Sequence, residues 1–423
     1  MSLLTRPRVI LIASVAVAAL TATATALLSK DLPAAKPEDV GLSSERLARM
    51  NKAIHAYVDA GRTPGVVTLI ARHGKVVHVD AYGKADLTSG RATRADDIFR
   101  MYSMTKPITS VALLTLYEEG KFQLTDPLSK YYPAFADVKV LTGTGAGGAM
   151  LLDSPRRPIT IQDVFRHTAG FTYGFFGGSP LDKMYTDANV LGKDLDDLMA
   201  KLGKLPLAYQ PGERWVYSVA HDVQAALVEK LSGQKFDAFV QQRIFTPLGM
   251  QDSMFKIPAD KKSRVPGLYS SVKGKLVPDT SALGTSYGEQ VFGGYSISTT
   301  ASDYALFAQM LLNKGQLNGV RILSPKTVEL MATNHLSRAA MESADILGRG
   351  TGYGLGVSVL MNPAERGNVG SVGEFGWSGA ASTHVLIDPK EDLVAIYCTQ
   401  LMGGDFNLRA EFATLLYQSI VGN

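Results

Sequence analysis

The stretch Met101-Tyr-Ser-Met-Thr-Lys-Pro107 predicts the start of a helix, and the rest of the chain is organised around it. Ser103 and Lys106 are three residues apart. A mostly apolar run follows as far as residue 117, with Gly120 placed as a C-terminal stop. Positions i and i+3 of a helix share a face, so we expect the Lys106 ammonium beside the Ser103 hydroxyl.

This Ser-x-x-Lys pair is a candidate nucleophile with its activating group. A serine hydroxyl is a poor nucleophile until a base removes its proton. A lysine in a dry pocket or near another cation can be neutral enough to assist, and a helix N-terminus favours negative charge on Ser103. The alternative interpretation is a capping serine with an exposed lysine, because Ser-x-x-Lys often occurs by chance.

The composition is that of an ordinary globular protein. The chain has 423 residues, of which 46% are hydrophobic and 19% charged, and this length suggests two or three domains or one large two-lobed unit. The net charge of +4 is too small and too evenly spread to predict nucleic-acid binding. The single cysteine, Cys398, excludes an internal disulfide, and the seven histidines show no metal-ligand spacing.

The N-terminus has the three parts of a secretory signal peptide. Arg6 and Arg8 precede an uncharged apolar run, and alternating Thr and Ala residues follow as far as residue 26. We therefore predict a signal peptide at 1–26 and a periplasmic or secreted protein. The alternative is a membrane anchor, since residues 9–28 are just long enough to span a bilayer, although they are weakly apolar. An uncleaved segment would be the chain's only membrane contact.

Hydrophobic periodicity predicts a sheet built from both ends of the chain, with helices between. Strands are expected at 65–71 and 76–82, which would form a hairpin around His73-Gly74-Lys75, and at 354–360, 382–387 and 393–399. Helices are expected at 43–60, 161–167, 192–202, 219–232, 235–246, 300–313, 325–334 and 407–421. We therefore predict an α/β domain from residues 27–95 and 286–423. A mostly helical domain, residues 96–285, would carry Ser103 and a second candidate motif.

That second motif is centred on Tyr217 in the stretch Pro211-Gly-Glu-Arg-Trp-Val-Tyr-Ser-Val219. Pro-Gly indicates a turn, and a helix is expected just after the tyrosine. A nearby lysine would favour the phenolate, which could then act as the general base for Ser103. The alternative is a tyrosine of the core.

A third motif, Trp377-Ser378-Gly379-Ala380, precedes a predicted strand. Gly379 would let an edge strand come close to a bound substrate. The backbone N–H of Ala380 could then pair with that of Ser103 to form an oxyanion hole. The alternative is a tight turn with a packed tryptophan.

Two other motifs are weaker. The segment Gly284-Thr-Ser286-Tyr-Gly288 matches the G-x-S-x-G nucleophile elbow, but no buried strand precedes it. Gly143-x-Gly145-x-x-Gly148 matches a dinucleotide fingerprint, but no helix can follow it, so a flexible loop is predicted. His167 is predicted to be structural, and His221 and Asp222 are expected near Tyr217.

Together, Ser103-Met-Thr-Lys106, Tyr217-Ser-Val219 and Trp377-Ser-Gly379 resemble the three motifs of the serine β-lactamase superfamily, in the same order. The resemblance is greatest to the class C β-lactamase-like esterases, the family VIII carboxylesterases. D-alanyl-D-alanine carboxypeptidases are more distant relatives. The similarity extends over about residues 37–420.

This resemblance implies a β-lactamase/penicillin-binding-protein-like fold, an antiparallel sheet flanked by helices with an inserted, mostly helical domain. It also implies an acyl-enzyme on Ser103, with Lys106 and Tyr217 as the proton-transfer pair. The Ser103 and Ala380 N–H groups would form the oxyanion hole, and no metal or cofactor is needed. The substrate pocket would be lined by Tyr102, Val219, Trp377, Ser378 and Gly379.

The chain departs from the β-lactamase motifs at two positions that bear on the choice of substrate. The β-lactamases carry asparagine where this chain has Val219, and lysine or histidine where it has Trp377. A cation would engage the carboxylate of a penicillin or a peptide, whereas Trp377 presents an apolar face. Both departures favour a neutral small-molecule ester.

The sequence therefore predicts an exported serine hydrolase that cleaves short- to medium-chain carboxylic esters. A transacylase would use the same acyl-enzyme with another acceptor. The alternatives are a β-lactamase or D-alanyl-D-alanine carboxypeptidase and, outside the enzymes, an acyl-accepting sensor that does not turn over.

Overall fold

The computed structural model describes residues 31–281, 284, 287–404 and 406–422. The predicted signal peptide and Ser286 lie outside these residues. Within them, no helix is both long enough and apolar enough to cross a membrane.

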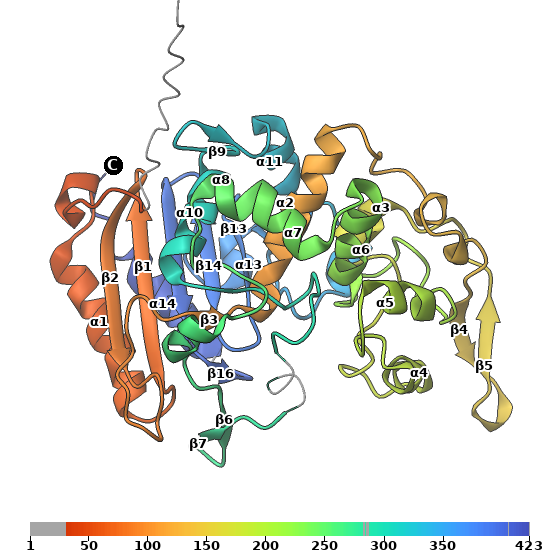
Figure 1. Ribbon diagram of the computed structural model, residues 1–423, viewed down its shortest axis with the longest axis horizontal. Helices are drawn as coiled ribbons and strands as arrows, with labels where there is room; N and C mark the ends of the chain where they lie inside the picture. The colour runs from red at the N-terminus through yellow and green to blue at the C-terminus, as the bar shows by residue number, and fades with distance from the viewer. Residues whose placement is uncertain (1–30, 282–283, 285–286, 405, 423) are drawn as a thin grey trace, which may run out of the picture.

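A seven-stranded antiparallel sheet draws on both ends of the chain (Figure 1). Its strand order is β11-β12-β13-β14-β15-β1-β2. The strands are β1 (Gly65–Arg72), β2 (Lys75–Gly83), β11 (Thr351–Tyr353), β12 (Ser358–Leu360), β13 (Phe375–Ser378), β14 (His384–Asp388) and β15 (Leu393–Cys398). The register of β1 on β15 runs from Val67 opposite Cys398 to Arg72 opposite Leu393. Through this pairing the N-terminal hairpin completes a sheet that is otherwise made by the C-terminal segment.

The turn between β1 and β2 confirms the predicted hairpin. Arg72 pairs with Lys75, so His73 and Gly74 form a two-residue loop. Their φ angles are +50° and +70°. Positive φ at both positions is the geometry of a type I′ turn, whose twist matches that of the flanking strands.

Helices cover both faces of the sheet (Figure 1). The alternating side chains of β15 show which helices pack on each face. Leu393, Ala395 and Tyr397 pack with α1 (Ser44–Asp59) and α14 (Phe406–Tyr417). Val394, Ile396 and Cys398 point to the opposite face, where α10 (Ala301–Leu312) packs against β1, β14 and β15. Both faces are therefore buried, which explains why all eight residues of β1 are buried. The predicted antiparallel sheet with flanking helices is confirmed.

Helix α2 (Thr105–Glu118) lies at the centre of the helical part. Every residue from 105 to 116 is buried, because α2 packs against α6 (Ala220–Ser232), α7 (Phe236–Val240) and β13. A helix that is apolar all round requires such an enclosed position. The shorter helices are α3 (Ile161–Phe165), α4 (Pro180–Ala188), α5 (Leu195–Leu202), α7 (Phe236–Val240), α8 (Thr246–Leu248), α11 (Pro325–Met331), α12 (Arg338–Glu342) and α13 (Pro363–Arg366).

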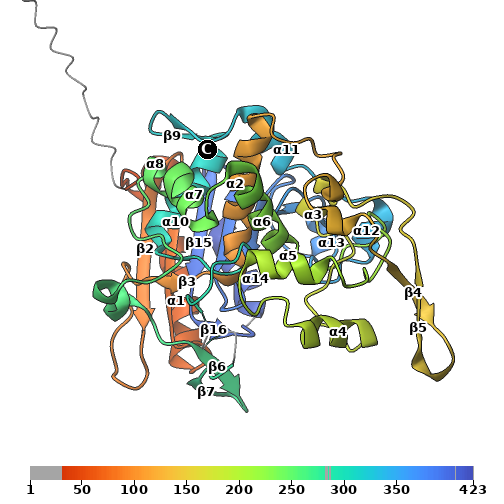
Figure 2. The same cartoon turned by 45° about the vertical axis from the view of Figure 1, so that its right-hand side comes forward.

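Short strands occur outside the main sheet. They are β3 (Phe99–Arg100) with β8 (Ser298–Thr299), β4 (Val140–Thr144) with β5 (Met150–Asp153), β9 (Gln316–Leu317) with β10 (Val320–Arg321), and β6 (Tyr269–Val272) between β7 (Lys275–Pro278) and β16 (Leu401–Met402). The β4–β5 hairpin, prominent in Figure 2, corrects the flexible loop predicted around Gly143 to Gly148. Strand β4 is also held by the distant Leu207, whose N–H donates to the Lys139 carbonyl at 2.7 Å, and strand formation depends strongly on such context.

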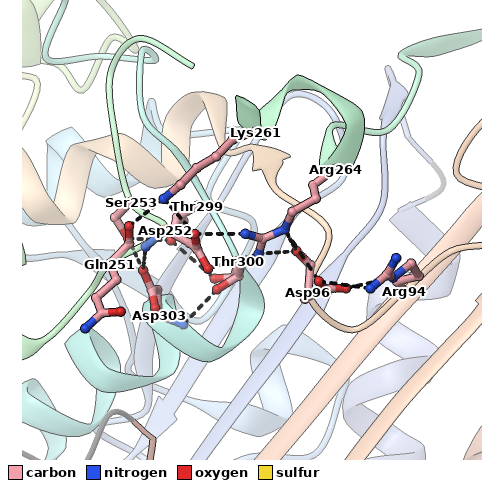
Figure 3. A network of polar contacts seen from close by, with 10 residues as sticks. All are labelled: Arg94, Asp96, Gln251, Asp252, Ser253, Lys261, Arg264, Thr299, Thr300 and Asp303. Carbon is pink, nitrogen blue, oxygen red and sulfur yellow. Dashed lines mark hydrogen bonds and ion pairs between the residues drawn. The ribbon is translucent and has the colours of Figure 1, made fainter. Parts of the chain in front are cut away.

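A polar network fixes the start of α10 (Figure 3). Thr300 caps the helix by accepting a hydrogen bond from the Asp303 N–H, at 3.1 Å. The Asp303 carboxylate accepts one from the Asp252 N–H at 2.6 Å, and the Asp252 carboxylate accepts two from Arg264 at 2.9 Å each. Arg264 also donates to the backbone carbonyl of Asp96 at 2.9 Å. Three distant segments are thus tied to one helix end.

Asp252→Asn should destabilise the protein at neutral pH. Hydrogen bonds from Arg264, together with Lys261, lower the pKa of Asp252 to about 2 despite partial burial. A carboxylate with a lowered pKa stabilises the fold above its unfolded pKa, and this contribution disappears as the pH falls through the folded value. We expect the variant to lose about 2 kcal/mol of unfolding free energy at pH 7 in urea titrations. The difference from wild type should shrink as the pH falls from 4 toward 2.

Glu329→Gln is a matched control, because the Glu329 pair with Lys326 is exposed and should matter little. A destabilisation of the Asp252→Asn variant that stayed the same at every pH would contradict this account of the network.

Candidate active site

Ser103 lies where the chain turns sharply into α2. It sits in a short 3-10 turn, Tyr102–Met104, that runs directly into the helix. Tyr102, just before it, has a φ of +45°, a left-handed conformation that is an outlier for a bulky residue. The Met104 carbonyl is held by the Tyr304 hydroxyl at 2.8 Å. As the spacing predicted, Ser103 is at the N-terminal end of a helix.

Three of the predicted residues come together at the Ser103 hydroxyl. The Tyr217 OH lies 2.7 Å from Ser103 Oγ, and Lys106 Nζ lies 3.1 Å from the same atom. Lys106 is fully buried, whereas Ser103 and Tyr217 are partly exposed. The serine oxygen therefore sits between a phenol and an amine, at the boundary between core and solvent.

The Lys106 nitrogen is held by the backbone of a neighbouring loop. Nζ donates to the Gly294 carbonyl at 2.8 Å, and the Gly294 N–H donates to Asp222 Oδ1 at 2.8 Å. A Cβ at position 294 would lie 2.9 Å from Asp222 Oδ2, so any larger residue would displace the Asp222 carboxylate. The pair Gly293-Gly294 is the one local sequence signal for this contact, because adjacent glycines allow close backbone approach.

Two buried imidazoles lie near the lysine and are neutral. Burial lowers the pKa of His167 well below its usual value, and Lys106 adds to the shift. The pKa of His221 is lowered in the same way by burial, then by His167 and Lys106. His167 Nδ1 is 3.2 Å from the Ser218 hydroxyl, and the residue has a φ of +56°. This placement in the core agrees with a structural role for His167.

Trp377 contributes an N–H as well as an apolar face. Its Nε1 donates to the Tyr217 oxygen at 3.4 Å, with ring centroids 5.7 Å apart. Trp215 also stacks on Tyr217, at 5.8 Å and an interplanar angle of 16°. Tyr353 packs against both tryptophans, and burial keeps its pKa well above the usual value, so it stays protonated. The sequence predicts the apolar face of Trp377 but not its hydrogen bond to Tyr217.

The third motif lies at the end of an inner strand, at a point where that strand has a partner on one side only among the described residues. Strand β13 lies between β12 and β14, but β12 pairs only with Phe375 and Gly376 among the described residues. Trp377 and Ser378 pair with β14 alone. At Gly379, a Cβ would lie 2.2 Å from the Met101 carbonyl oxygen and 2.3 Å from Thr383 Oγ1. The glycine therefore lets this turn pack against the segment that enters Ser103.

Some residues expected to line the substrate pocket are placed elsewhere. Val219 is fully buried in the main core, and Tyr102 is 1% exposed against Tyr287. The Ser378 hydroxyl contacts His384 Nδ1 at 2.9 Å and Arg409 at 2.7 Å. Because side chains alternate along a strand, Ser378 points away from the face that carries Trp377. Within the third motif, the Trp377 side chain is the one that contacts Tyr217.

The part of the chain that the structure describes contains no group of three or more His, Cys, Asp or Glu side chains able to hold a metal ion. The groups gathered at the site are a serine, a lysine, a tyrosine and the indole N–H of a tryptophan. These are the groups used in nucleophilic catalysis through a covalent intermediate.

Comparison with known proteins identifies the family. The beta-lactamase family model matches residues 50–418. The chain belongs to the beta-lactamase family. It is 33% identical to Protein Rv1367c of Mycobacterium tuberculosis over 82% of this chain and 88% of that protein. It is 31% identical to lovastatin esterase of Penicillium rubens over 83% of this chain and 92% of that protein.

The fold agrees with this assignment. The structure resembles simvastatin synthase (LovD) of Aspergillus terreus with a TM-score of 0.77 and 24% identity, covering 89% of this chain and 98% of that one. The chain is therefore an enzyme of the serine hydrolase class with the β-lactamase-like fold that its motifs resemble.

Asp222→Asn should change how stability depends on pH. Burial raises the pKa of Asp222 to about 6, although Lys106 and backbone N–H groups oppose the shift. A carboxyl with a raised pKa holds its proton more tightly when folded, so its contribution to stability is greatest below about pH 4 and declines as the pH rises through 6. Relative to wild type, the variant should gain about 3 kcal/mol of unfolding free energy between pH 4 and pH 7.

Urea titrations of both proteins between pH 4 and pH 7 measure the difference in their unfolding free energies. The buried histidines change stability with pH in the opposite direction, but they do so equally in both proteins, so their effect cancels in this difference. The asparagine oxygen can still accept from the Gly294 N–H, so the backbone contact is retained. A difference between the two proteins that does not vary with pH would contradict the raised pKa.

Proposed function

We propose that the protein is an exported serine hydrolase that cleaves short- to medium-chain carboxylic esters through an acyl-enzyme on Ser103. The observation that carries this proposal is the arrangement at the Ser103 hydroxyl, which lies 2.7 Å from the Tyr217 oxygen and 3.1 Å from Lys106 Nζ. Export is inferred from the sequence of residues 1–26.

Acylation begins when Ser103 Oγ attacks the ester carbonyl carbon. Its proton passes to the Tyr217 oxygen, which acts as the phenolate in this step. The buried Lys106 nitrogen and the Trp377 N–H both face Tyr217 and would stabilise negative charge there. Tyr217 then gives the proton to the oxygen of the leaving alcohol as the ester C–O bond breaks. The products are the free alcohol and an acyl ester on Ser103.

The negative charge that develops on the carbonyl oxygen would be bound by the backbone N–H groups of Ser103 and Ala380. The close packing of Gly379 against the Met101 carbonyl supports this pairing, because it keeps the two segments side by side. Each such donor is typically worth about 10²–10³ in rate.

Deacylation repeats these proton transfers with a new nucleophile. Water gives a proton to Tyr217 and attacks the acyl carbon, and Ser103 regains its proton as the acid leaves. An alcohol in place of water would give a new ester, so the same residues would also support acyl transfer.

The surroundings of Tyr217 support a neutral ester as substrate. Trp377 stands where β-lactamases have a cation, and its 9% exposed indole offers apolar surface. Leaving a substrate carboxylate unpaired in a partly dry site is costly. The name of the relative lovastatin esterase points in the same direction. A β-lactamase or carboxypeptidase activity is therefore the weaker candidate.

Ser103→Ala should abolish turnover of p-nitrophenyl butyrate, by at least about 10³-fold, without altering the thermal unfolding transition. Intact-protein mass spectrometry should detect an acyl adduct on the wild type but not on the variant. Ser286→Ala is the control from the competing G-x-S-x-G motif and should leave the rate within a few-fold. Loss of activity in Ser286→Ala but not in Ser103→Ala would overturn the assignment.

The substrate class is tested by comparing nitrocefin with p-nitrophenyl butyrate. We expect kcat/KM for nitrocefin to be orders of magnitude lower, because Trp377 cannot pair its carboxylate. The Trp377→Lys variant should show a smaller difference in kcat/KM between the two substrates, mainly because its reaction with the ester is weaker. Comparable kcat/KM for the two substrates in the wild type would instead favour a β-lactamase.

A further inference from the structure

Two exposed phenylalanines lie beside Tyr217. The exposed fractions of Phe175 and Phe176 are 58% and 61%. The Phe176 ring centroid is 6.0 Å from that of Tyr217, and the two phenylalanine rings are 4.6 Å apart. Both also pack on Tyr173, at 5.1 and 5.7 Å. A continuous aromatic strip therefore runs from solvent to the residue that touches Ser103 Oγ.

The loop that carries the two rings is anchored on both sides by Asp182 of α4. Before the rings, Thr172 donates to Asp182 Oδ1 at 3.0 Å, and a Cβ at Gly174 would lie 2.8 Å from the Asp182 carbonyl. After them, Ser179 donates to Asp182 Oδ2 at 2.7 Å, and a Cβ at Gly177 would lie 2.2 Å from that oxygen. The loop thus holds the rings out in a fixed position.

Holding two large apolar side chains in water is unfavourable, and covering them with an apolar group recovers that free energy. Flat aromatic faces also stack well on other rings. The rings adjoin Tyr217, so the molecule that covers them is one that reaches the active site.

The proposed mechanism identifies the part of the substrate that covers the two phenylalanine rings. Tyr217 must give its proton to the oxygen of the leaving alcohol, so this oxygen has to come within hydrogen-bond reach of Tyr217. The alcohol portion of the ester therefore extends on the side of Tyr217, where Phe176 lies. The acyl portion remains bonded to Ser103.

We propose that Phe175 and Phe176 form a subsite for the alcohol portion of the ester, which selects aromatic or bulky apolar alcohols. This inference rests on the proposed function and adds the class of alcohol to it. Discrimination by an apolar subsite of this kind is typically worth about tenfold or more in kcat/KM.

Two matched pairs of substrates test the subsite. 2-Naphthyl acetate and ethyl acetate differ only in the alcohol, whereas p-nitrophenyl acetate and p-nitrophenyl butyrate differ only in the acyl group. In the Phe175→Ala/Phe176→Ala variant, the naphthyl-to-ethyl ratio of kcat/KM should fall about tenfold relative to wild type. The butyrate-to-acetate ratio should stay within twofold. Comparing ratios with wild type cancels the different intrinsic reactivities of the esters.

Leu151→Ala is the control for removing an exposed apolar side chain, because Leu151 is 52% exposed on the distant β4–β5 hairpin (Figure 1). It should change neither ratio. The variant Phe175→Leu/Phe176→Leu keeps apolar volume but has no rings. If the alanine variant fails to fold, the same substrate ratios are measured in this variant and compared with wild type. Its naphthyl-to-ethyl ratio should also fall, but by less.

Three results would overturn the subsite. These are an unchanged naphthyl-to-ethyl ratio, an equal loss of activity toward all four esters, and a larger change in the butyrate-to-acetate ratio. An equal loss would mean that the rings only position Tyr217. A wild type that turns over none of the four esters would overturn the proposed function itself, so the two failures are distinguishable.

Discussion

The burial of the Lys106 amine is the constraint on which the rest of the site depends. A charged or strongly polar nitrogen removed from water is costly unless its hydrogens find partners. Here Nζ donates to Ser103 Oγ and to the Gly294 carbonyl, and it faces the rings of Tyr217 and Tyr173 at 4.7 and 5.6 Å. Each partner comes from a different segment, so satisfying one amine fixes several segments around α2.

The sheet supplies the remaining wall of the site. The turn after β13 can reach the Ser103 segment only because Gly379 packs against the Met101 carbonyl. That strand is held in turn by β14 and β15, and β15 pairs with the N-terminal strand β1. Segments 282 residues apart, at Met101 and Thr383, therefore meet directly beside Ser103. The start of α10, tied by Asp303 and Asp252, secures the helix that packs against the same strands.

Features encoded by local sequence could be predicted. The His73-Gly74 turn, the apolar spacing of α1, the Thr300 cap and the Ser103–Lys106 spacing all act over a few residues, and the structure contains each of them. The order of the three motifs indicated the family because short motifs in combination are specific. The division into two domains and the export signal stay predictions.

Features that depend on distant contacts were missed or misplaced. The sequence predicts a loop at the β4–β5 hairpin, where β4 also pairs with the distant Leu207, and it predicts Val219 and Ser378 in the pocket. Whether a residue next to a motif faces the core or the site depends on which face its helix or strand buries, and one residue of shift reverses the answer. The contact of Lys106 with Gly294, and the position of Phe176 beside Tyr217, join segments with no sequence relation.

The environment of Tyr217 links these constraints to the choice of substrate. Its oxygen faces Ser103 and the Trp377 N–H, its ring faces Lys106, and its other neighbours are aromatic. Trp377 supplies a hydrogen-bond donor to the Tyr217 oxygen without adding a charge beside it. The same indole offers no partner to a substrate carboxylate, and an unpaired carboxylate in a partly dry site is costly. One residue therefore serves Tyr217 and, at the same time, supports the neutral ester proposed as substrate.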